Sequence, residues 1–391
     1  MAVDRRTFFL ASAGALGAQT PPSGQIRVGV IGSGGRGRLP MGIFARDPHV
    51  RLAAVCDVYE PNLEAGLSAA KGEAKAYRNY KALLDDKSLD AVIIATPEHW
   101  HHRQLLDALA AGKDVYIEKP LCQTPEQGVE MVDAVKRSQS IVQVGMQRRS
   151  YDLYLKGRDV RRAGTLGTVR AVRSWWLNNY LRGGTAQLKG PLDWEQWQGP
   201  APRRPMDPQR FFQWRFFAEY AGGIVADQGA HVFDGIHLIM DLGYPAAVTA
   251  SAGRAHKQGV DTPETVVVAA EYPDDFLAVF TINYAAMRYR RQNDQMNHFD
   301  GDGARMDIGR EAMAVYKEGA ETTPVLTAAG SFDRAVDLHV ADFLACVRTR
   351  RTPTAPVELG FQAALVVQMA NRSLKEGRRL RWNAEARRIQ S

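Results

Sequence analysis

Gly32-Ser33-Gly34-Gly35-Arg36-Gly37 is the stretch that decides the fold of this chain. It spells G-x-G-x-x-G directly after the apolar run 26–31 and ahead of a helix-like stretch. In that context the first glycine permits a tight turn, the second lets the backbone approach a pyrophosphate, and the last allows a helix to pack closely. The free N–H groups of the following helix favour the phosphates. We therefore expect these six residues to form a dinucleotide-binding loop.

Apolar strand-like runs alternate with helical stretches around this loop, which is typical of a doubly wound parallel sheet. The expected strands cover residues 26–31, 52–56, 91–95, 114–117 and 141–144, and the expected helices cover residues 61–70, 80–84, 102–111 and 125–138. The fold class is therefore α/β, with a Rossmann-type domain over residues 24–147. The 391-residue length suits a second domain, expected over residues 148–391.

Asp57 indicates which dinucleotide is bound. It lies at the end of the second expected strand, 20 residues after Gly37. A carboxylate at this place can accept hydrogen bonds from the adenine ribose hydroxyls, and it repels a 2′-phosphate. The sequence therefore predicts NAD rather than NADP as the cofactor.

Thr96-Pro97-Glu98-His99-Trp100-His101-His102 follows the third expected strand. Three histidines in four residues raise the possibility of a metal site, but no carboxylate or cysteine pattern completes one. We therefore expect no metal. Instead, Trp100 and His101 are expected to lie near the nicotinamide.

Glu118-Lys119-Pro120 supplies an ionisable lysine just past the fourth expected strand, where open parallel sheets hold their ligands. Further along, Asp227 and His231 are four residues apart, so on a helix they share one face and could point into a single cleft. The alternative for this pair is an aspartate in the first turn of a helix with an unrelated core histidine.

Together these motifs resemble the Gfo/Idh/MocA family, the glucose–fructose oxidoreductase and inositol dehydrogenase group. The matching stretches are the glycine loop, Thr96-Pro97 with His101, Ala111-Gly112-Lys113 leading into Glu118-Lys119-Pro120, and Gly222-Gly223-Ile224-Val225-Ala226-Asp227-Gln228-Gly229-Ala230-His231. The resemblance covers nearly the whole chain after its N-terminal segment. It implies a second, α+β domain on a large open-faced, mostly antiparallel sheet, and a homodimer or homotetramer.

The resemblance also implies Lys119, Asp227 and His231 as the catalytic set. Oxidising a secondary alcohol moves a hydride to the nicotinamide while a base removes the hydroxyl proton, and either Lys119 or His231 could be that base. The other expected cofactor contacts are Thr96, Pro97, Trp100, His101, Glu118, Lys119 and Gln147. The expected substrate contacts are Arg148, Tyr180, Arg215, Asp227 and His231.

The second half of the chain is rich in residue types that bind sugars. Its expected strands cover residues 168–176, 248–252, 265–271 and 277–284, and its C-terminal helices cover residues 332–348 and 359–376. Aromatic and planar hydrogen-bonding side chains that suit polyols occur at Trp175, Trp176, Asn178, Asn179, Tyr180, Trp214 and Arg215. Trp194, Trp197 and residues 199–208 fit either this role or a packed surface loop.

The N-terminus predicts export. Asp4-Arg5-Arg6-Thr7-Phe8-Phe9-Leu10 is a twin-arginine pattern, and a short, mildly apolar run follows. We expect residues 1–23 to be a removable signal and linker, and the mature protein to be periplasmic; the alternative is a tail on a cytoplasmic enzyme. No later segment is apolar enough to span a membrane. Three scattered cysteines predict no disulfide framework.

The net charge of +7 comes from dispersed residues without an aromatic-interleaved basic stripe, so nucleic-acid binding is not expected. We instead expect an exported NAD-dependent oxidoreductase that acts on a carbohydrate or cyclitol hydroxyl. Free NAD is scarce outside the cytoplasm, so the cofactor must stay bound. A redox-neutral, NAD-dependent glycosidase is the main alternative. A non-catalytic sugar or nucleotide sensor is the other, although Lys119, Asp227 and His231 argue against it.

Overall fold

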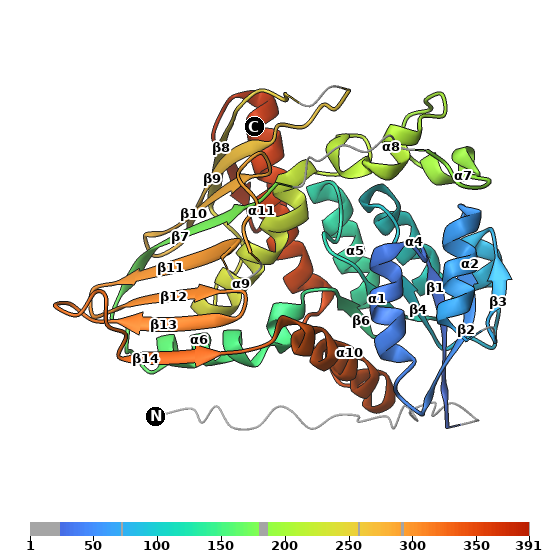
Figure 1. Ribbon diagram of the computed structural model, residues 1–391, viewed down its shortest axis with the longest axis horizontal. Coiled ribbons are helices and arrows are strands. Elements are labelled where there is room, and N and C mark those ends of the chain that lie inside the picture. Colours follow the sequence, from blue (N-terminus) through green and yellow to red (C-terminus); the bar gives the residue numbers. More distant parts are fainter. Residues whose placement is uncertain (1–23, 72, 180–186, 257–258, 291–292, 391) are drawn as a thin grey trace, which may run out of the picture.

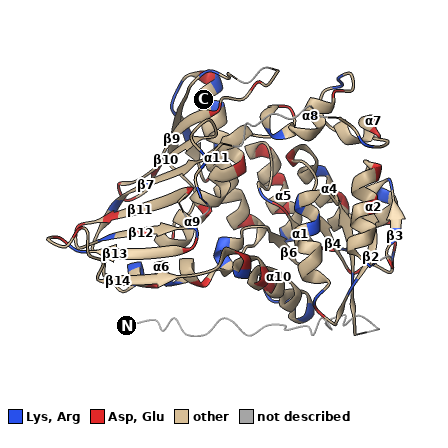
Figure 2. Cartoon of the chain, viewed as in Figure 1, with Lys and Arg blue, Asp and Glu red and all other residues tan. Residues whose placement is uncertain are grey.

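Two sheets organise the chain, one in each half of the molecule (Figure 1). The structure, a computed structural model, describes residues 24–390 except 72, 180–186, 257–258 and 291–292. The expected signal and Tyr180 therefore lie outside the described residues. No helix in the described part of the chain is long and apolar enough to cross a membrane. Lys and Arg are interspersed with Asp and Glu over the elements of both halves (Figure 2).

The first sheet is parallel and has the strand order β3-β2-β1-β4-β5-β6. Its strands are β1 (Ile26–Ile31), β2 (Val50–Cys56), β3 (Lys75–Tyr77), β4 (Ala91–Ile94), β5 (Asp114–Ile117) and β6 (Val142–Val144). The apolar runs are continuous because helices cover both faces of the sheet. The order reverses between β1 and β4, so the carboxyl ends of these strands border the crevice in which such sheets bind ligands.

The helices of this half are α1 (Gly35–Phe44), α2 (Glu60–Ala69), α3 (Tyr80–Leu84), α4 (Glu98–Ala110) and α5 (Pro125–Arg137). The main difference from expectation is α4, which begins four residues before the predicted start at 102. Pro97 occupies its N-cap position and Glu98 its first turn, where a carboxylate favours the helix dipole. The three histidines therefore lie on the first turns of a helix.

The second sheet has the order β14-β13-β12-β11-β7-β10-β9-β8-β15-β16, and its neighbouring strands are antiparallel except β7 and β10. The predicted fold class is confirmed. The strands are β7 (Val169–Leu177), β8 (Ala247–Ala252), β9 (Thr265–Tyr272), β10 (Phe276–Asn283), β11 (Gln295–Gly301), β12 (Arg305–Gly309), β13 (Ala312–Tyr316), β14 (Leu326–Ala329), β15 (Leu380–Asn383) and β16 (Arg388–Ile389).

One face of this sheet is covered by helices, and the other is open within the described chain. The helices of the second half are α6 (Asp152–Arg162), α7 (Trp194–Gln198), α8 (Pro208–Phe212), α9 (Ala230–Met240), α10 (Phe332–Thr349) and α11 (Val357–Glu376), with 3₁₀ turns at Gln147–Ser150 and Trp214–Phe216. Burial alternates along β9 and β10, and Val267 and Leu277 of the open face are exposed. The expected open-faced sheet is therefore present.

The C-terminal helices return to the body, as expected. α11 packs on α5, α9 and β8, whereas α10 joins the core of the parallel sheet. Phe343 of α10 lies against Phe44 of α1 and Tyr116 of β5, with ring centroids 5.8 and 5.9 Å apart. The two halves therefore share a continuous core, and this ties the parallel sheet to the end of the chain.

Three buried histidines predict loss of stability in mild acid. Burial lowers the pKa of His99 to about 4, of His237 to about 3 and of His339 to about 4. Below about pH 6.5 the unfolded chain binds more protons at these sites, so the stability present above that pH is lost as the pH falls. Glu98 opposes them, because burial raises its pKa to about 7 and the folded form then gains the proton first.

Each of these three histidines costs about 1 kcal/mol between pH 6.5 and 5.5 and Glu98 returns a similar amount, so these four groups together give a net loss of about 2 kcal/mol. Burial also lowers the pKa of His101 and of His231, and both add to the loss. Urea unfolding at the two pH values measures it. Glu98→Gln removes the opposing group and should make the loss steeper. An unfolding free energy that is flat or rises from pH 6.5 to 5.5 would contradict the prediction.

Candidate active site

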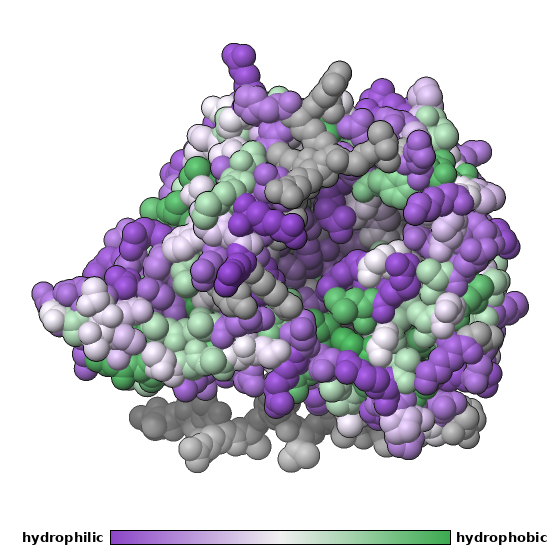
Figure 3. Space-filling model, in the orientation of Figure 1, coloured by the Kyte–Doolittle hydropathy of each residue, from purple (hydrophilic) through white to green (hydrophobic). Residues whose placement is uncertain are grey.

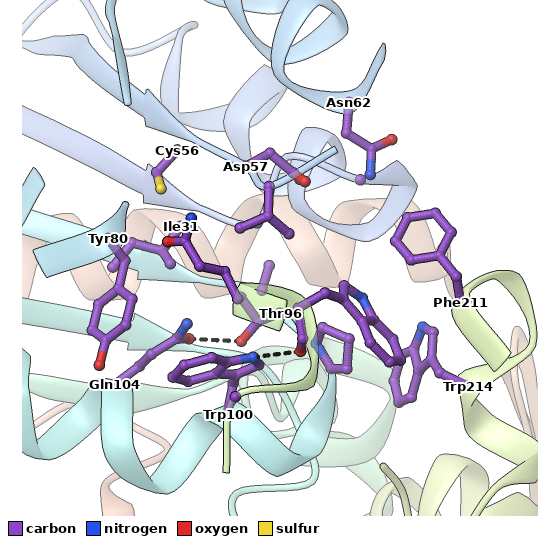
Figure 4. A pocket seen from close by; sticks show the side chains of 18 of the residues that line it. Ile31, Cys56, Asp57, Asn62, Tyr80, Thr96, Trp100, Gln104, Phe211 and Trp214 are labelled. Atoms are coloured by element: carbon purple, nitrogen blue, oxygen red, sulfur yellow. Dashed lines mark hydrogen bonds between the residues drawn. The ribbon is translucent and has the colours of Figure 1, made fainter. Parts of the chain in front are cut away.

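A cavity of about 680 Å³ lies at the carboxyl ends of β1, β2 and β4. The surface between the two halves is hollowed, and most of the residues seen inside the hollow are hydrophilic (Figure 3). In the close-up of the cavity, Asp57 lies on one side, Thr96 and Trp100 on the opposite side, and Phe211 and Trp214 toward the second domain (Figure 4). Most of the predicted cofactor contacts line it: Gly32, Gly34, Gly35, Arg36, Asp57, Thr96, Pro97 and Trp100.

The glycine loop has the shape that a dinucleotide requires. Gly32 has φ +88°, and a Cβ there would lie 2.9 Å from the backbone of Ala95. A Cβ on Gly37 would lie 2.0 Å from the carbonyl oxygen of Gly32, so helix α1 packs directly on the strand end. A Cβ on Gly35, in contrast, would meet nothing within 4 Å, because this residue faces the cavity. The loop therefore leaves open backbone beside the N-terminus of α1, which fits a pyrophosphate.

Ser33 and Gly37 stabilise the shape of this loop on its buried side. Ser33 is buried, its N–H donates to Asp57 Oδ2 at 2.9 Å, and its hydroxyl donates to the carbonyl oxygen of Asn62 at 2.8 Å. The second carboxylate oxygen of Asp57 accepts the N–H of Tyr59 at 2.9 Å. Asp57 also lines the cavity, where its carboxylate can accept a ribose hydroxyl. Asp57 therefore orders the loop and faces the cavity at the same time.

Asp57 leads to a prediction on cofactor choice. The protein should bind NAD more tightly than NADP. Asp57→Ala should reduce the ratio of the two affinities by about tenfold, which is the effect of losing a hydrogen bond to a charged group. Titration of both cofactors into the apo protein measures it. Asp57→Asn keeps an oxygen that can accept the backbone N–H groups but removes the negative charge. It therefore distinguishes the role of Asp57 in ordering the loop from its repulsion of the 2′-phosphate of NADP. Tighter NADP binding by the unmodified protein would contradict the assignment.

His101 is buried between two loops. It is only 1% exposed, and its ring nitrogens lie 2.8 Å from the carbonyl oxygen of Pro120 and 2.9 Å from that of Thr96. It therefore ties the loop after β5 to the loop after β4, and its place near the nicotinamide stays a prediction. Trp100 does line the cavity, and its indole N–H donates to the carbonyl oxygen of Trp197. In the described part of the chain, no cluster of His, Cys, Asp and Glu is arranged to hold a metal.

Lys119 and Asp227 meet across the domain boundary. Lys119 Nζ lies 3.1 Å from Asp227 Oδ1 and donates to the carbonyl oxygen of Asp227 at 2.6 Å. Arg215 pairs with the same carboxylate oxygen at 3.4 Å and also lines the cavity. Tyr284 at the end of β10 donates its hydroxyl proton to Asp227 Oδ2 at 2.7 Å. The carboxylate therefore joins Lys119 to the wall of the cofactor cavity.

Burial favours protonation of the Asp227 carboxyl, but Lys119, Arg215 and the Tyr284 hydroxyl overcome it and hold its pKa far below the usual value. Asp227 is thus a permanent anion near neutral pH. It lies on a π-helical turn (Val225–Gly229) that continues into α9, where His231 stands in the first turn. The expected helical spacing of the pair is present, and the π-turn is a frequent feature of functional sites.

His231 is neutral in the folded protein. Burial, together with the positive charges of Lys119 and Arg148, lowers its pKa well below 6.5. Its Nδ1 atom is buried and has no hydrogen-bond partner within the described structure. A neutral imidazole next to a charged lysine provides one group that can accept a proton and one that can donate a hydrogen bond.

Arg148 and Gln147, the predicted substrate and cofactor contacts, are both buried. Arg148 donates to the carbonyl oxygen of His231 at 3.0 Å and also contacts Gln295, so it supports the start of helix α9. Gln147 is likewise buried, with its amide nitrogen 3.2 Å from the hydroxyl of Tyr116. Neither lines the cavity, because the turn that carries them lies in the core between the domains.

Two buried carboxylates join the glycine loop and the Asp227 segment to the rest of the site. Glu118, a predicted cofactor contact, forms an ion pair with Arg36 of the loop at 2.8 Å. Glu98 is 3% exposed and accepts the N–H of Gly222 at 2.9 Å, ahead of the Asp227 turn. Sequence analysis missed Glu98 and Tyr284, because each acts on a residue far away in sequence.

Trp194 packs against the buried Trp197, as the packed-loop alternative expects, and the segment 194–214 also lines the cofactor cavity. Trp197, Phe211, Phe212 and Trp214 line the cofactor cavity. Trp175, one of the expected sugar contacts, packs against His298 on the large sheet in a tilted arrangement, with ring centroids 4.8 Å apart. The 194–214 segment is therefore part of the wall opposite the glycine loop.

Comparison with known proteins now identifies the family. Residues 26–146 match the description "Oxidoreductase family, NAD-binding Rossmann fold", and residues 154–306 match the "GFO/IDH/MocA C-terminal domain". The chain belongs to the Gfo/Idh/MocA oxidoreductase family. The resemblance inferred from the motifs is thereby confirmed, and the first domain is the NAD-binding Rossmann domain of this family.

Individual relatives match over shorter stretches. Levoglucosan dehydrogenase from Pseudarthrobacter phenanthrenivorans is 27% identical over 54% of this chain and 50% of its own. Inositol 2-dehydrogenase from Salmonella typhimurium is 32% identical over 41% of this chain and 46% of its own. Glycosyl hydrolase family 109 protein 2 from Shewanella sp. (strain ANA-3) is 32% identical over 32% of this chain and 29% of its own. The chain thus matches half or less of the length of these relatives.

Over the whole molecule, the fold is similar to that of solved structures. A levoglucosan dehydrogenase in complex with NADH and levoglucosan superposes with a TM-score of 0.73, covering 91% of this chain and 99% of that chain at 18% identity. At this identity the likeness shows the two-domain fold alone.

Proposed function

We propose that this protein is an NAD-dependent oxidoreductase that transfers a hydride between a secondary hydroxyl of a carbohydrate or cyclitol and tightly bound NAD. The observation that carries the proposal is the Lys119–Asp227–Arg215 network, which joins an acid–base pair to the wall of a cavity fit for a dinucleotide. Relatives that act on levoglucosan and inositol support the substrate class.

NAD, when bound, supplies the hydride acceptor, and the residues of this chain handle the proton. In the oxidising direction the neutral His231 can accept the hydroxyl proton. In the reverse direction the same imidazole, now protonated, returns that proton to the carbonyl oxygen, and the Lys119 ammonium can donate a hydrogen bond to this oxygen in both directions. Asp227 holds Lys119 in place through the 3.1 Å ion pair, and Tyr284 holds Asp227. One site therefore serves both directions of a reversible hydride transfer.

Mass spectrometry of the purified protein, followed by a substrate screen, tests this function. We expect bound NAD or NADH, and NADH absorbance should appear when sugars or cyclitols are added. Glycosides in the same screen report aglycone release. Bound dinucleotide with no turnover of any sugar, cyclitol or glycoside would favour the sensor reading and contradict the proposal.

Redox-neutral glycoside cleavage is the second candidate, supported by the match to the glycosyl hydrolase family 109 protein. In that cycle a ring carbon is oxidised, the aglycone is eliminated, water adds, and the same carbon is reduced again, so no hydride is lost overall. Enzyme given a glycoside but no added nucleotide should then turn over many times. Activity strictly proportional to added NAD⁺, with stoichiometric NADH release, would contradict this closed cycle.

We further propose export through the twin-arginine pattern at Arg5 and Arg6. Cofactor retention follows from it, because a periplasmic enzyme must load NAD before transport. Fractionation of cells that express the full chain should find it in the periplasm, and the Arg5→Lys, Arg6→Lys variant should stay in the cytoplasm. Cytoplasmic retention of both proteins in the native host would overturn the localisation.

We also propose that the open face of the large sheet forms the contact in a homodimer or homotetramer. Its exposed apolar side chains, such as Val267 and Leu277, suit burial against a second copy. Light scattering on the purified protein reports the assembly, and Leu277→Asp should shift it toward the monomer.

A further inference from the structure

We infer that residues 188–217, here called the cap, close over the adenosine end of the cofactor cleft and set the rate at which NAD leaves. The inference rests on the proposed function, because it concerns the same bound cofactor. It goes beyond that function because it assigns cofactor retention to the second domain and not to the Rossmann loop.

The cap is joined by backbone hydrogen bonds to the strand end that carries Asp57. The N–H of Asp193 donates to the carbonyl oxygen of Val58 at 2.9 Å, and the N–H of Glu60 donates to that of Pro191 at 3.0 Å. Tyr59 and Leu192 form an antiparallel bridge between these bonds. Since Asp57 faces the adenine ribose in this fold, the cap is attached next to the adenosine end.

A second attachment joins the cap to the start of α4. The indole N–H of Trp100 donates to the carbonyl oxygen of Trp197 at 2.9 Å, and Nε2 of His99 lies 3.0 Å from the same atom. Gly199, with φ +49°, lies directly against the Trp100 ring: a Cβ added to Gly199 would come within 2.0 Å of that ring. The cap and one wall of the cavity are thus in direct contact.

An aromatic cluster fills the space between these attachments. Tyr59 from the first domain packs on Phe211, with ring centroids 4.9 Å apart, and Phe211 packs on Trp197 at 5.6 Å. All three are buried. Phe212 is different: it is 43% exposed and lines the cavity. An exposed aromatic ring at the edge of a ligand cavity gains burial when the ligand is present.

The consequence is that a dinucleotide in this cleft has protein on both sides. The Rossmann loop holds the phosphates, and the cap covers the adenosine half from the second domain. Departure of the cofactor therefore requires the cap to separate from residues 58–60 and from Trp100. NAD release should be slow for this reason, whereas substrate exchange at Lys119 and His231 need not move the cap.

Cofactor exchange measures the role of the cap directly. The full chain is loaded with NADH, excess NAD⁺ is added, and the loss of energy transfer from tryptophan to NADH gives the dissociation rate. Phe212→Ala should raise this rate by about tenfold, the value of burying part of an aromatic side chain. Met206→Ala is the matched control, because Met206 is 51% exposed in the same segment and does not line the cavity.

Gly199→Ala is the second variant, since its methyl group must push the cap away from Trp100. Faster NADH release by both variants, with Met206→Ala like the unmodified protein, supports the cap. Unchanged release rates for Phe212→Ala and Gly199→Ala would overturn it. The exchange assay contains no sugar, so it tests the cap separately from the proposed function. The role of the cap can be disproved in a protein that oxidises sugars, and slow cofactor exchange can be found in a protein that oxidises none.

Discussion

Alanine in place of Lys119 is expected to lower turnover by about 100- to 10,000-fold, the usual contribution of a general acid–base group. Lys119 is paired with Asp227 and does not line the cofactor cavity, so NAD should remain bound in the variant. His231→Ala should have a loss in the same range, because it removes the neutral proton acceptor. Steady-state kinetics, together with the NAD content of each purified variant, measures both effects.

A matched control shows whether the loss of turnover is specific to Lys119 or follows from removing any lysine. Lys136 on α5 is 59% exposed at its side chain and forms only a long surface pair with Glu358 at 3.7 Å. Lys136→Ala should leave kcat and NAD content unchanged. A Lys119→Ala or His231→Ala variant with near-normal kcat would show that the catalytic role of that residue is wrong.

Replacing Gly37 with alanine is expected to abolish measurable NAD binding and to destabilise the first domain. Its Cβ would lie 2.0 Å from the carbonyl oxygen of Gly32, and that backbone atom cannot move without opening the dinucleotide loop. Overpacking of this kind costs about 1–3 kcal/mol even where side chains can adjust. NADH titration and thermal unfolding of the purified variant measure the two effects.

Gly42→Ala is the control for this change, because it lies in the same helix α1 and its Cβ would meet nothing within 4 Å. Alanine in an exposed helical position stabilises by up to about 1 kcal/mol relative to glycine. NAD binding should be normal in that variant. If the Gly37→Ala variant binds NADH as tightly as the Gly42→Ala variant, the dinucleotide site does not require close packing at Gly37.

The first domain could be predicted almost completely from the sequence. The loop at residues 32–37 and the alternation of apolar runs determine a parallel sheet, and each predicted strand overlaps an observed one. Lys119 could be placed beside the cleft because it follows a strand directly. The second domain was harder to predict from the sequence. Only four of its strands could be recognised, because short antiparallel strands have a weak alternation of apolar and polar residues.

Three of the predicted contacts are buried in the structure for a common reason. Arg148, Gln147 and His101 are polar residues next to family motifs, and their neighbours in sequence suggest contact with a ligand. Their side chains instead turn into the core, where Arg148 meets His231 and His101 meets Pro120 and Thr96. Buried polar groups must find partners, and those partners come from other segments of the chain.

What the sequence determined by itself is therefore local: the dinucleotide loop, the carboxylate at Asp57, and the four-residue spacing of Asp227 and His231. Each depends on backbone geometry within a few residues, which side-chain type and spacing report directly. The tertiary structure alone decided that Tyr284 fixes Asp227, that Glu98 holds Gly222, and that residues 188–217 cover the cofactor cavity. These contacts join residues more than 50 positions apart, because packing within the second domain brings Tyr284 to Asp227 and packing between the two domains brings Glu98 to Gly222.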